Sequence, residues 1–380
     1  MNLDNYREKI DHIDNDLLRL FEERMNIVSE IAAYKKTAGL PVFDPRRETE
    51  KQAVISQKSQ PETEPFAHIL FDTLFEVSRA HQRAAITTSS LKQKISTAMN
   101  DTPQMFPERA TVACQGVMGA YAQLAATRLF ARPDIQYFNT FDSVFSAIES
   151  GFCEYGVLPL ENSTAGSVNK VYGLLQEHNF HIVRSVRMKI DHNLAVRPGV
   201  NISDVREIIS HEQALAQCAA FLEKLGPNVK ITACENTAAA AEAVAQSDRR
   251  DIAAICSHNC LRLYGLEAAA RDIQDRSNNY TRFICIAKKL EIYPGADRTS
   301  IMMVLPHTPG SLYKALGRFY ALGVNISKLE SRPLPERDFD FMFYLTLETS
   351  VYSDNLLMIL DDMQEFCEEF KYLGSYTEVI

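Results

Sequence analysis

Residues 156–167 read GVLPLENSTAGS, and this stretch indicates how the middle of the chain is built. Residues 156–160 are apolar enough for a buried strand, and Glu161, Asn162 and Ser163 follow at once. We expect a strand, a polar turn and then a helix, with residues 163–167 near the helix start. A strand end and the free N–H groups of the next helix form an anion-binding crevice, so this cluster is predicted to line a ligand cleft. Helix capping would explain one hydroxyl, but not the carboxylate and the amide beside it.

Similar transitions follow three other parts of the middle segment. SHEQALAQ follows REII, CENTAAAA precedes an Ala-rich helix, and NNYTRF comes before the strand FICIA. From Thr111 to about Lys289, short apolar strands alternate with helical stretches, which is the pattern of an α/β fold. Four polar transitions of this kind predict two lobes that close on one cleft.

The composition limits the classes of protein to which the chain can belong. A length of 380 residues predicts two or three domains, and 46% hydrophobic residues suffice for a core in each. A net charge of −9 argues against a general nucleic-acid binder, but not against a local basic pocket for an anionic substrate. The start MNLDNYREKI has no apolar signal core, and no apolar run reaches membrane-spanning length. The eight Cys are scattered without the spacing of a disulfide framework, so we expect reduced thiols. We therefore expect a cytoplasmic protein that binds neither nucleic acid nor membrane.

The motif CSHNC could suggest a metal, because it brings Cys256, His258 and Cys260 within five residues. A closed zinc site needs four ligands, and no second Cys/His pair lies nearby in the sequence. A loop after the apolar strand DIAAIC is the better interpretation, so we expect no metal.

Residues 1–87 have a helical pattern without strand-like alternation. We expect one helix over DHIDNDLLRLFEERMNIVSEIAAYKK, a second from DPRRETEKQAVISQ and a third over EPFAHILFDTLFEVSRAHQRAA. Asp44 suits the N-cap of the second helix and Pro45 its first turn. Because helices this long leave little to pack inside one protomer, we expect an intertwined homodimer or a higher homo-oligomer. Residues 88–108 are polar and contain Pro, as is typical of a linker.

A stripe on the first helix combines apolar and cationic side chains. Its members are spaced three or four residues apart and share one face: Leu17, Phe21, Arg24, Val28, Ile31 and Lys35. Ser78 and Gln82 continue the apolar face of the third helix, while Asp44 and Glu48 face together at the start of the second. Taken singly, these residues fit an interface ion pair, a solvated face and acids that complement a helix dipole. Together they predict a polar pocket inside the bundle, whose charges a dianionic ligand would compensate.

Residues 297–380 alternate strands and helices in another order. They contain, in sequence, the strand TSIMMVLP, the helix GSLYKALGRFYALG, the strands VNISKLESRP and DFMFYLTLE, a helix from Ser353 and a last short strand. This βαββαβ order predicts a ferredoxin-like α+β domain. Gly310 lets backbone N–H groups meet a ligand carboxylate at a helix start, although a Gly cap and a strand-end salt bridge explain the same spacing.

Residues 3–83 resemble the all-helical chorismate mutases. The resemblance implies that Arg7 of the other protomer, Arg24 and Lys35 hold the substrate carboxylates. It also implies that Lys35 and Gln82 face the ether oxygen, and that Asp44 and Glu48 contact the hydroxyl end. The Claisen rearrangement needs no nucleophile, only a chair-like conformer and stabilisation of charge on the ether oxygen. The full set that it implies includes one residue from the other protomer and two supporting residues: Arg7 (from the other protomer), Arg24, Lys35, Asp44, Arg47, Glu48, Ser78 and Gln82.

Residues 109–290 resemble prephenate dehydratase, on the motifs GVLPLENSTAG and NYTRF, with IDHNLAV and SHEQALAQC in addition. The resemblance implies two α/β lobes like those of periplasmic binding proteins, and Thr281 as the hydrogen-bond donor to the departing ring hydroxyl. Loss of carbon dioxide and aromatisation drive this elimination, so a placed donor lowers the barrier. Further residues shape the pocket or complete the motif: Asn162, Ser163, Ser210, Gln217, Glu235, Arg282 and Phe283.

One turn departs from the pattern of this family. In QGVMGAYAQ, Ala120 and Ala122 flank Tyr121, where the family carries hydroxyl groups next to its aromatic residue. An Ala at the first position is similar to arogenate dehydratases, so the preference between prephenate and arogenate stays open. The mutase-like segment upstream favours prephenate.

The C-terminal segment resembles the ACT domain, an amino-acid sensor. Its neighbours in the chain imply phenylalanine as the ligand, and such domains usually pair, so that the ligand biases the dehydratase lobes between open and closed states. The residues that match ligand-binding motifs are Gly310, Ser311, Leu312, Glu330, Ser331, Arg332 and Pro333.

The order of the three segments resembles the bifunctional P-proteins of phenylalanine biosynthesis. We therefore expect conversion of chorismate to prephenate and of prephenate to phenylpyruvate, with inhibition by phenylalanine. Neither step moves electrons to an acceptor, so no metal or organic cofactor is implied. Two alternatives are a mutase joined to an arogenate dehydratase, and a non-catalytic amino-acid-binding regulatory protein. Thr281 together with Asn162 argues against the second alternative, because binding alone needs only carboxylate anchors.

Overall fold

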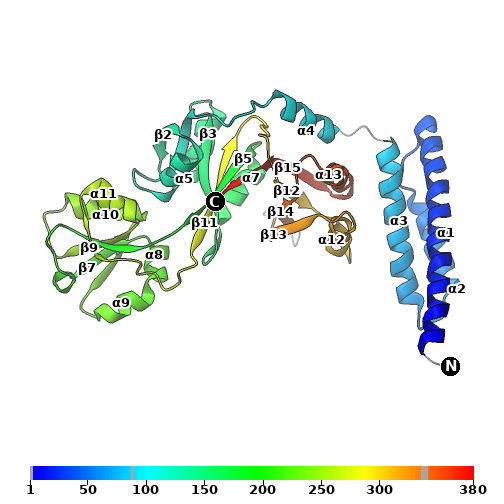
Figure 1. The fold of residues 1–380 in the computed structure, drawn as a ribbon, viewed down its shortest axis with the longest axis horizontal. Coiled ribbons are helices and arrows are strands. Elements are labelled where there is room, and N and C mark those ends of the chain that lie inside the picture. The colour runs from blue at the N-terminus through cyan, green and yellow to red at the C-terminus, as the bar shows by residue number, and fades with distance from the viewer. Residues whose placement is uncertain (1–2, 87–89, 335–340) are drawn as a thin grey trace. The chain divides into compact units, whose positions relative to one another are not determined.

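The computed structural model describes residues 3–86, 90–334 and 341–380 and divides the chain into two compact units (Figure 1). One unit comprises residues 1–94 and 357–366, and the other comprises residues 95–356 and 367–380. None of the helices in these described ranges is long and apolar enough to cross a membrane.

The first unit begins with the three predicted helices, α1 (Leu3–Ala38), α2 (Pro45–Lys58) and α3 (Glu64–Ile86). Asp44 is the N-cap of α2 and accepts the N–H of Arg47 at 3.1 Å, as predicted. Both α1 and α2 pack against α3, yet only Val28 and Ala32 of α1 are buried. Large apolar side chains stay exposed along the whole of α1: Leu3, Tyr6, Ile10, Ile13, Leu17, Leu18, Leu20, Ile27 and Ile31.

The segment predicted as a linker contains the helix α4, Ser90–Asp101. Ile95 and Ala98 are buried, and the N–H of Ile292 donates to Oγ1 of Thr102 at 3.0 Å. The apolar positions recur every three or four residues, but polar residues outnumber them and conceal the pattern. Residues 90–101 of this segment therefore form a helix with buried apolar side chains, and this helix spans the boundary between the two units.

Sheet A forms the first lobe of the second unit, with strand order β16-β5-β11-β3-β1-β2 and β4 paired to β3. The neighbours β1, β2 and β3 run parallel, while β11 runs antiparallel between β3 and β5. Its strands are β1 (Arg109–Gln115), β2 (Arg132–Phe138), β3 (Tyr155–Asn162), β4 (Gly166–Ser167), β5 (His181–Lys189), β11 (Tyr280–Ala287) and β16 (Glu378–Val379). Its helices are α5 (Tyr121–Leu129), α6 (Phe141–Glu149) and α7 (Asn169–Glu177).

The turn after β3 differs from the prediction. Glu161 and Asn162 end the strand, and β4 then pairs back with β3. The helix α7 begins only at Asn169, and its N-cap, Val168, makes no side-chain bond. Residues 163–167 therefore lie before the helix, as predicted, but they belong to a short hairpin that was not predicted.

Sheet B forms the second lobe, with strand order β10-β6-β9-β7-β8. Its strands are β6 (Asn193–Val196), β7 (Glu207–Ser210), β8 (Lys230–Ala233), β9 (Ile252–Cys256) and β10 (Glu267–Ala270). Figure 1 shows α10 (Thr237–Gln246) and α11 (His258–Tyr264) on one face, and α8 (Glu212–Gln217) and α9 (Ala219–Leu225) on the other. Each face has its own apolar core. The chain enters this lobe between β5 and β6, just after the short crossover 190–192, and returns through residues 271–279 before β11.

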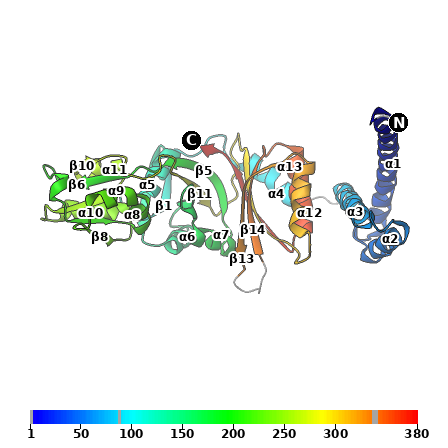
Figure 2. The same cartoon turned by 90° about the horizontal axis from the view of Figure 1, so that it is seen from below.

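The C-terminal segment has the predicted βαββαβ order. Its elements are β12 (Arg298–Val304), α12 (Ser311–Ala321), β13 (Asn325–Pro333), β14 (Phe341–Glu348), α13 (Asp354–Phe366) and β15 (Glu369–Tyr376). The strands form the antiparallel sheet C in the order β13-β14-β12-β15. Sheet C lies against sheet A, where Met302, Val304 and Tyr344 share a core with Leu158 and Ile182 (Figure 2). After β15 the chain leaves sheet C, and β16 pairs with β5 of sheet A, which the sequence did not indicate.

Candidate functional site

A network of buried and partly buried amides and hydroxyls lies where the two α/β lobes meet. Asn162, at the end of β3, donates through Nδ2 to Oγ1 of Thr281 at 2.9 Å and to Oδ1 of Asn279 at 2.7 Å. Thr281 is 7% exposed and Asn279 is 2% exposed. Because β11 pairs with β3 in a register that sets Thr281 opposite Asn162, the sheet itself fixes this contact.

The second lobe contributes Gln217, the last residue of α8, to the same network. Its Nε2 donates to Oγ1 of Thr164 at 3.1 Å, and its Oε1 accepts from Nδ2 of Asn279 at 3.0 Å. His192, in the crossover from sheet A to sheet B, contacts the same Oε1 through Nε2 at 2.8 Å. Burial lowers the pKa of His192, so its imidazole is neutral at pH 7. The network therefore joins both lobes and a crossover.

Three predicted residues, Asn162, Gln217 and Thr281, thus come together as expected. The sequence did not single out Asn279 or His192 as members. Both lie inside motifs that carried the resemblance, NYTRF and IDHNLAV, but a motif does not show which of its side chains turn toward Thr281. For Asn279, the signal available in the sequence was an amide side chain directly before a strand.

Ser163 supports the network from outside. Its Oγ donates to the carbonyl of Asn278 at 2.8 Å and accepts the N–H of Tyr280 at 2.9 Å. It therefore ties the β3–β4 hairpin to the start of β11.

Three further predicted residues do not join the network. The hydroxyl of Ser210 is buried and donates to the carbonyl of Ile255 at 2.7 Å. Phe283 packs in the core between sheet A and α5. Glu235 is exposed in the loop before α10. Ser210 and Phe283 therefore have structural partners in this conformation.

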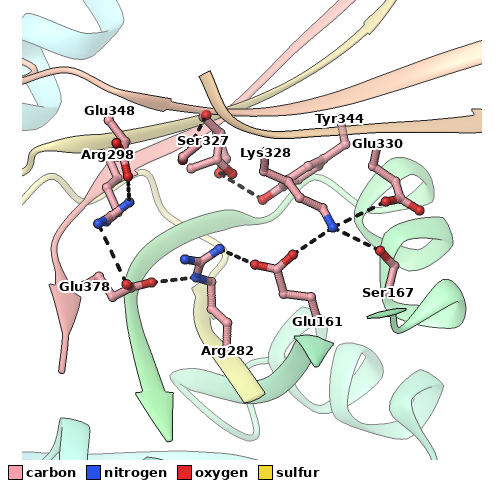
Figure 3. Close-up of polar contacts among 12 residues, drawn as sticks. Glu161, Ser167, Arg282, Arg298, Ser327, Lys328, Glu330, Tyr344, Glu348 and Glu378 are labelled. Atoms are coloured by element: carbon pink, nitrogen blue, oxygen red, sulfur yellow. Dashed lines mark hydrogen bonds and ion pairs between the residues drawn. The ribbon is translucent and has the colours of Figure 1, made fainter. Parts of the chain in front are cut away.

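Arg282 takes part in a chain of ion pairs (Figure 3). Its guanidinium contacts Glu161 and lies 2.5 Å from Glu378. Nζ of Lys328, on β13, lies 2.8 Å from Glu161 and 3.3 Å from Glu330. Alternating charges therefore connect the strands that carry Asn162 and Thr281 to the strand that carries the LESRP motif.

The sensor-motif residues lie on α12 and β13. Gly310 is the N-cap of α12 with φ +84°, a conformation that favours glycine, and Oγ of Ser311 lies 2.8 Å from Oγ1 of Thr308. Leu312 follows on the helix, and Ser331 and Pro333 lie on β13 with Glu330.

Arg332 reaches the dehydratase-like segment. It donates to the carbonyl of Asn169 at 3.2 Å and to its Oδ1, and its guanidinium lies 5.2 Å from the ring centroid of Tyr172. The strand that carries the predicted sensor motif therefore contacts the start of α7 through Arg332.

In the helical unit, Arg24 and Ser78 meet as predicted. Nη1 of Arg24 donates to Oγ of Ser78 and to the carbonyl of Leu74 at 3.3 Å, and burial lowers the pKa of this arginine. Gln82 lies one turn further along α3 and is 7% exposed. Its Oε1 is buried without a hydrogen-bond partner among the described residues.

The other members surround the connection between α1 and α2. Nζ of Lys35 donates to the carbonyl of Val42 at 2.6 Å, Asp44 caps α2, and Arg47 is exposed. Glu48 contacts Arg79, whose guanidinium also lies 5.2 Å from the ring centroid of Phe43. Arg79 directly follows Ser78 in the sequence, but it was not predicted to belong to this group.

Arg7 is far from this group. It is exposed and pairs with Asp4 at 3.3 Å. Seventeen residues of the single helix α1 separate it from Arg24, which is about 25 Å at 1.5 Å per residue. Arg7 therefore cannot meet Arg24 within one protomer.

Comparisons with known proteins match two parts of the chain to different families. Residues 6–83 match the family model of chorismate mutase type II, and residues 112–291 match that of prephenate dehydratase. The bifunctional chorismate mutase/prephenate dehydratase of Aquifex aeolicus is 32% identical over 375 residues, which cover 98% of this chain and 97% of the relative.

Two other similar proteins each cover 70% of the chain. The Arabidopsis thaliana protein described as arogenate dehydratase/prephenate dehydratase 2, chloroplastic, is 40% identical over 280 residues, 70% of this chain and 73% of the relative. The crystal structure of prephenate dehydratase from Arthrobacter aurescens in complex with L-Phe is 27% identical, with a TM-score of 0.65 over 70% of this chain and 90% of that chain.

Proposed function

This chain belongs to the family of bifunctional chorismate mutase/prephenate dehydratases, and from that premise we propose which of its residues carry out each step. It is an enzyme of phenylalanine biosynthesis with two activities. The mutase rearranges chorismate to prephenate. The dehydratase converts prephenate to phenylpyruvate with loss of carbon dioxide and water.

Thr281 is the hydrogen-bond donor of the dehydratase step. The bond between ring and carboxylate breaks, its electron pair completes the aromatic ring, and the ring hydroxyl leaves with its own bonding pair. A hydrogen bond from Thr281 stabilises the negative charge on this oxygen until a solvent proton makes it water. The observation that supports this role is the 2.9 Å contact in which Asn162 donates to Thr281, because it leaves the threonine hydrogen free for a ligand.

Arg24, Lys35 and Gln82 form the centre of the mutase site. Arg24 and Lys35 bind the carboxylates, and Lys35 with Gln82 stabilises charge on the ether oxygen, while Asp44 and Glu48 face the hydroxyl end. Among the described residues, the buried Oε1 of Gln82 has no hydrogen-bond partner, which supports a role in binding a ligand or a second chain.

The mutase works as an intertwined dimer in which Arg7 reaches the site of the other protomer. Two observations support this arrangement. Arg7 lies about 25 Å along α1 from Arg24, and the large apolar side chains exposed along α1 need a cover.

Sheet C with its helices is an ACT domain that binds phenylalanine and inhibits the dehydratase. The similar Arthrobacter protein binds L-Phe, and the βαββαβ order here is that of a ferredoxin-like sensor. Inhibition passes through the ion pairs of Lys328 with Glu161 and of Glu161 with Arg282, since Arg282 adjoins Thr281 in β11.

A two-step assay tests the whole function. Purified protein supplied with chorismate should consume the chorismate, measured as a loss of ultraviolet absorbance. It should also produce phenylpyruvate, measured by the absorbance of this product in alkali. Phenylalanine should slow the second step. Prephenate that accumulates without phenylpyruvate, while added arogenate is consumed, would instead support an arogenate dehydratase.

A further inference from the structure

The hydrogen-bond network at the lobe junction has one direction, and the backbone fixes it. Oδ1 of Asn162 accepts the N–H of Thr164 at 3.0 Å and the N–H of Ala165 at 2.8 Å. A backbone N–H can only donate, so this atom of the amide is the oxygen. The atom that faces Thr281 and Asn279 is therefore the NH₂ group, and both of these residues must accept from it.

Asn279 carries this direction into the second lobe. Its Oδ1 is used by Asn162 at 2.7 Å, so its Nδ2 faces Gln217 at 3.0 Å, and the atom of Gln217 that meets it must be Oε1. His192 approaches the same Oε1 at 2.8 Å through Nε2, so Nε2 carries the hydrogen. Nδ1 of His192 then bears a lone pair, and it is buried without a hydrogen-bond partner among the described residues.

We propose that Asn279 is a positioning residue of the dehydratase, which takes its orientation from Asn162 and imposes it on Gln217 and on the tautomer of His192. The network then contains a hydroxyl whose hydrogen is free to donate, that of Thr281, and an unprotonated ring nitrogen, Nδ1 of His192. The catalytic consequence rests on the role proposed above for Thr281, whereas the tautomer of His192 does not depend on that role.

The tautomer of His192 is the direct test, measured by nitrogen NMR on the full-length protein with ¹⁵N-labelled histidine at pH about 8, where histidine is neutral and a carboxyl is ionised. The wild type should show His192 as Nε2–H. In Asn279→Asp the carboxylate can only accept, so Gln217 must turn its amide and present NH₂ to both neighbours. The hydrogen of His192 should then move to Nδ1. The control Asn278→Asp adds the same charge at an exposed neighbour and should keep Nε2–H.

Kinetics give the second readout. Asn279→Asp and Asn279→Ala should lower the dehydratase kcat by roughly 10- to 100-fold, with a smaller change in KM, because a misoriented site loses alignment of its groups. Mutase activity of the same samples should stay at the wild-type value, which normalises for the amount of protein, and a thermal melt reports the folding of the second unit.

An Nδ1–H tautomer of His192 in the wild type would overturn the proposal, even if no variant folds. So would an Nε2–H tautomer that persists in folded Asn279→Asp, or wild-type kcat in both variants. Thr281→Ala could keep full dehydratase activity while the tautomer of His192 changes to Nδ1–H in Asn279→Asp. In that case the proposed role of Thr281 is wrong, and the role of Asn279 in orienting the network stands.

Discussion

The two enzymatic sites of this chain differ in how much of each a single protomer completes. The dehydratase network consists of neutral amides, hydroxyls and an imidazole, and both lobes of one protomer supply its hydrogen-bond partners. The mutase site contains mostly charged side chains, and the amide oxygen of Gln82 has no partner among the described residues. Arg7 lies too far along α1 to take part in the site of its own protomer. Neutral groups can satisfy one another inside a protein, whereas a cluster of cations needs an anion to compensate it. With the roles proposed for these residues, the first site is preorganised by its own chain, whereas the second also needs its ligand and a partner protomer.

The largest effect should follow from removing the hydroxyl of Thr281. Thr281→Ala should lower the dehydratase kcat by roughly 10²- to 10⁴-fold, because the leaving hydroxyl loses its donor. The mutase rate of the same protein should not change. Thr281→Ser keeps a hydroxyl on the same strand and should retain most of the activity, so a loss as large as that of the alanine variant would argue against a donor role. Phenylpyruvate formation from supplied prephenate is the measurement.

Lys35→Ala should produce the reverse pattern with a slightly smaller loss. The mutase kcat should fall by roughly 10²- to 10³-fold, as is typical when one preorganised donor to a developing negative charge is removed. Dehydratase activity on supplied prephenate should remain. Lys36→Ala is the matched control, because Lys36 is exposed and donates only to the carbonyl of Ala85 at 3.0 Å among its described contacts.

A mixture of two inactive proteins tests whether the mutase site is shared between protomers. Arg7→Ala and Lys35→Ala should each lose most mutase activity. After denaturation and refolding together in equal amounts, half of the dimers should contain both chains, and each of these has one intact site. The mixture should therefore recover about a quarter of the wild-type mutase activity. No recovery would mean that Arg7 does not act in the site of the other protomer, and would remove the difference between the two sites described here.

Local signals in the sequence predicted much of the fold. Asp44 and Pro45 predicted the start of α2, because an N-cap and a first-turn proline act on neighbouring residues. Apolar runs such as DIAAIC and RFICIA predicted buried strands for the same reason. Elements that depend on a partner distant in the sequence were not predicted. The helix α4 depends on the surface that covers Ile95, and the two residues of β16 form a strand only because β5 offers them an edge.

The candidate sites show the same limit. Asn162 and Thr281 could be predicted as partners, since each stands in a distinctive motif, but the role of Asn279 depends on the register of β11 against β3. Arg79 follows Ser78 directly, yet its partner Glu48 lies on another helix, so the sequence gives no sign of the pair. A motif identifies residues that act together, whereas hydrogen-bond direction and ion pairing need coordinates.

The smallest expected effect concerns regulation, and it asks how far the dehydratase site is independent of the rest of its chain. Lys328 and Glu161 have side chains only 19% exposed, so their ion pair at 2.8 Å is less screened than one at the surface. Lys328→Met removes the charge that links β13 to Glu161, and Glu161 then keeps its ion pair with Arg282. We expect the concentration of phenylalanine for half-inhibition to rise by about 5- to 10-fold, a loss of roughly 1 kcal/mol of coupling, while the rate without phenylalanine stays close to that of the wild type.

Lys289→Met is the control for this variant, because it removes the same charge from an exposed position after β11. It should leave inhibition unchanged, whereas added salt should weaken inhibition of the wild type less than Lys328→Met does, since the ion pair is partly buried. Wild-type sensitivity in Lys328→Met would mean that phenylalanine acts on the lobes by another route, such as the contact of Arg332 with Asn169. The completeness of the dehydratase network within one protomer would then extend to its control, because the amides around Thr281 would hold their geometry without the charges behind them.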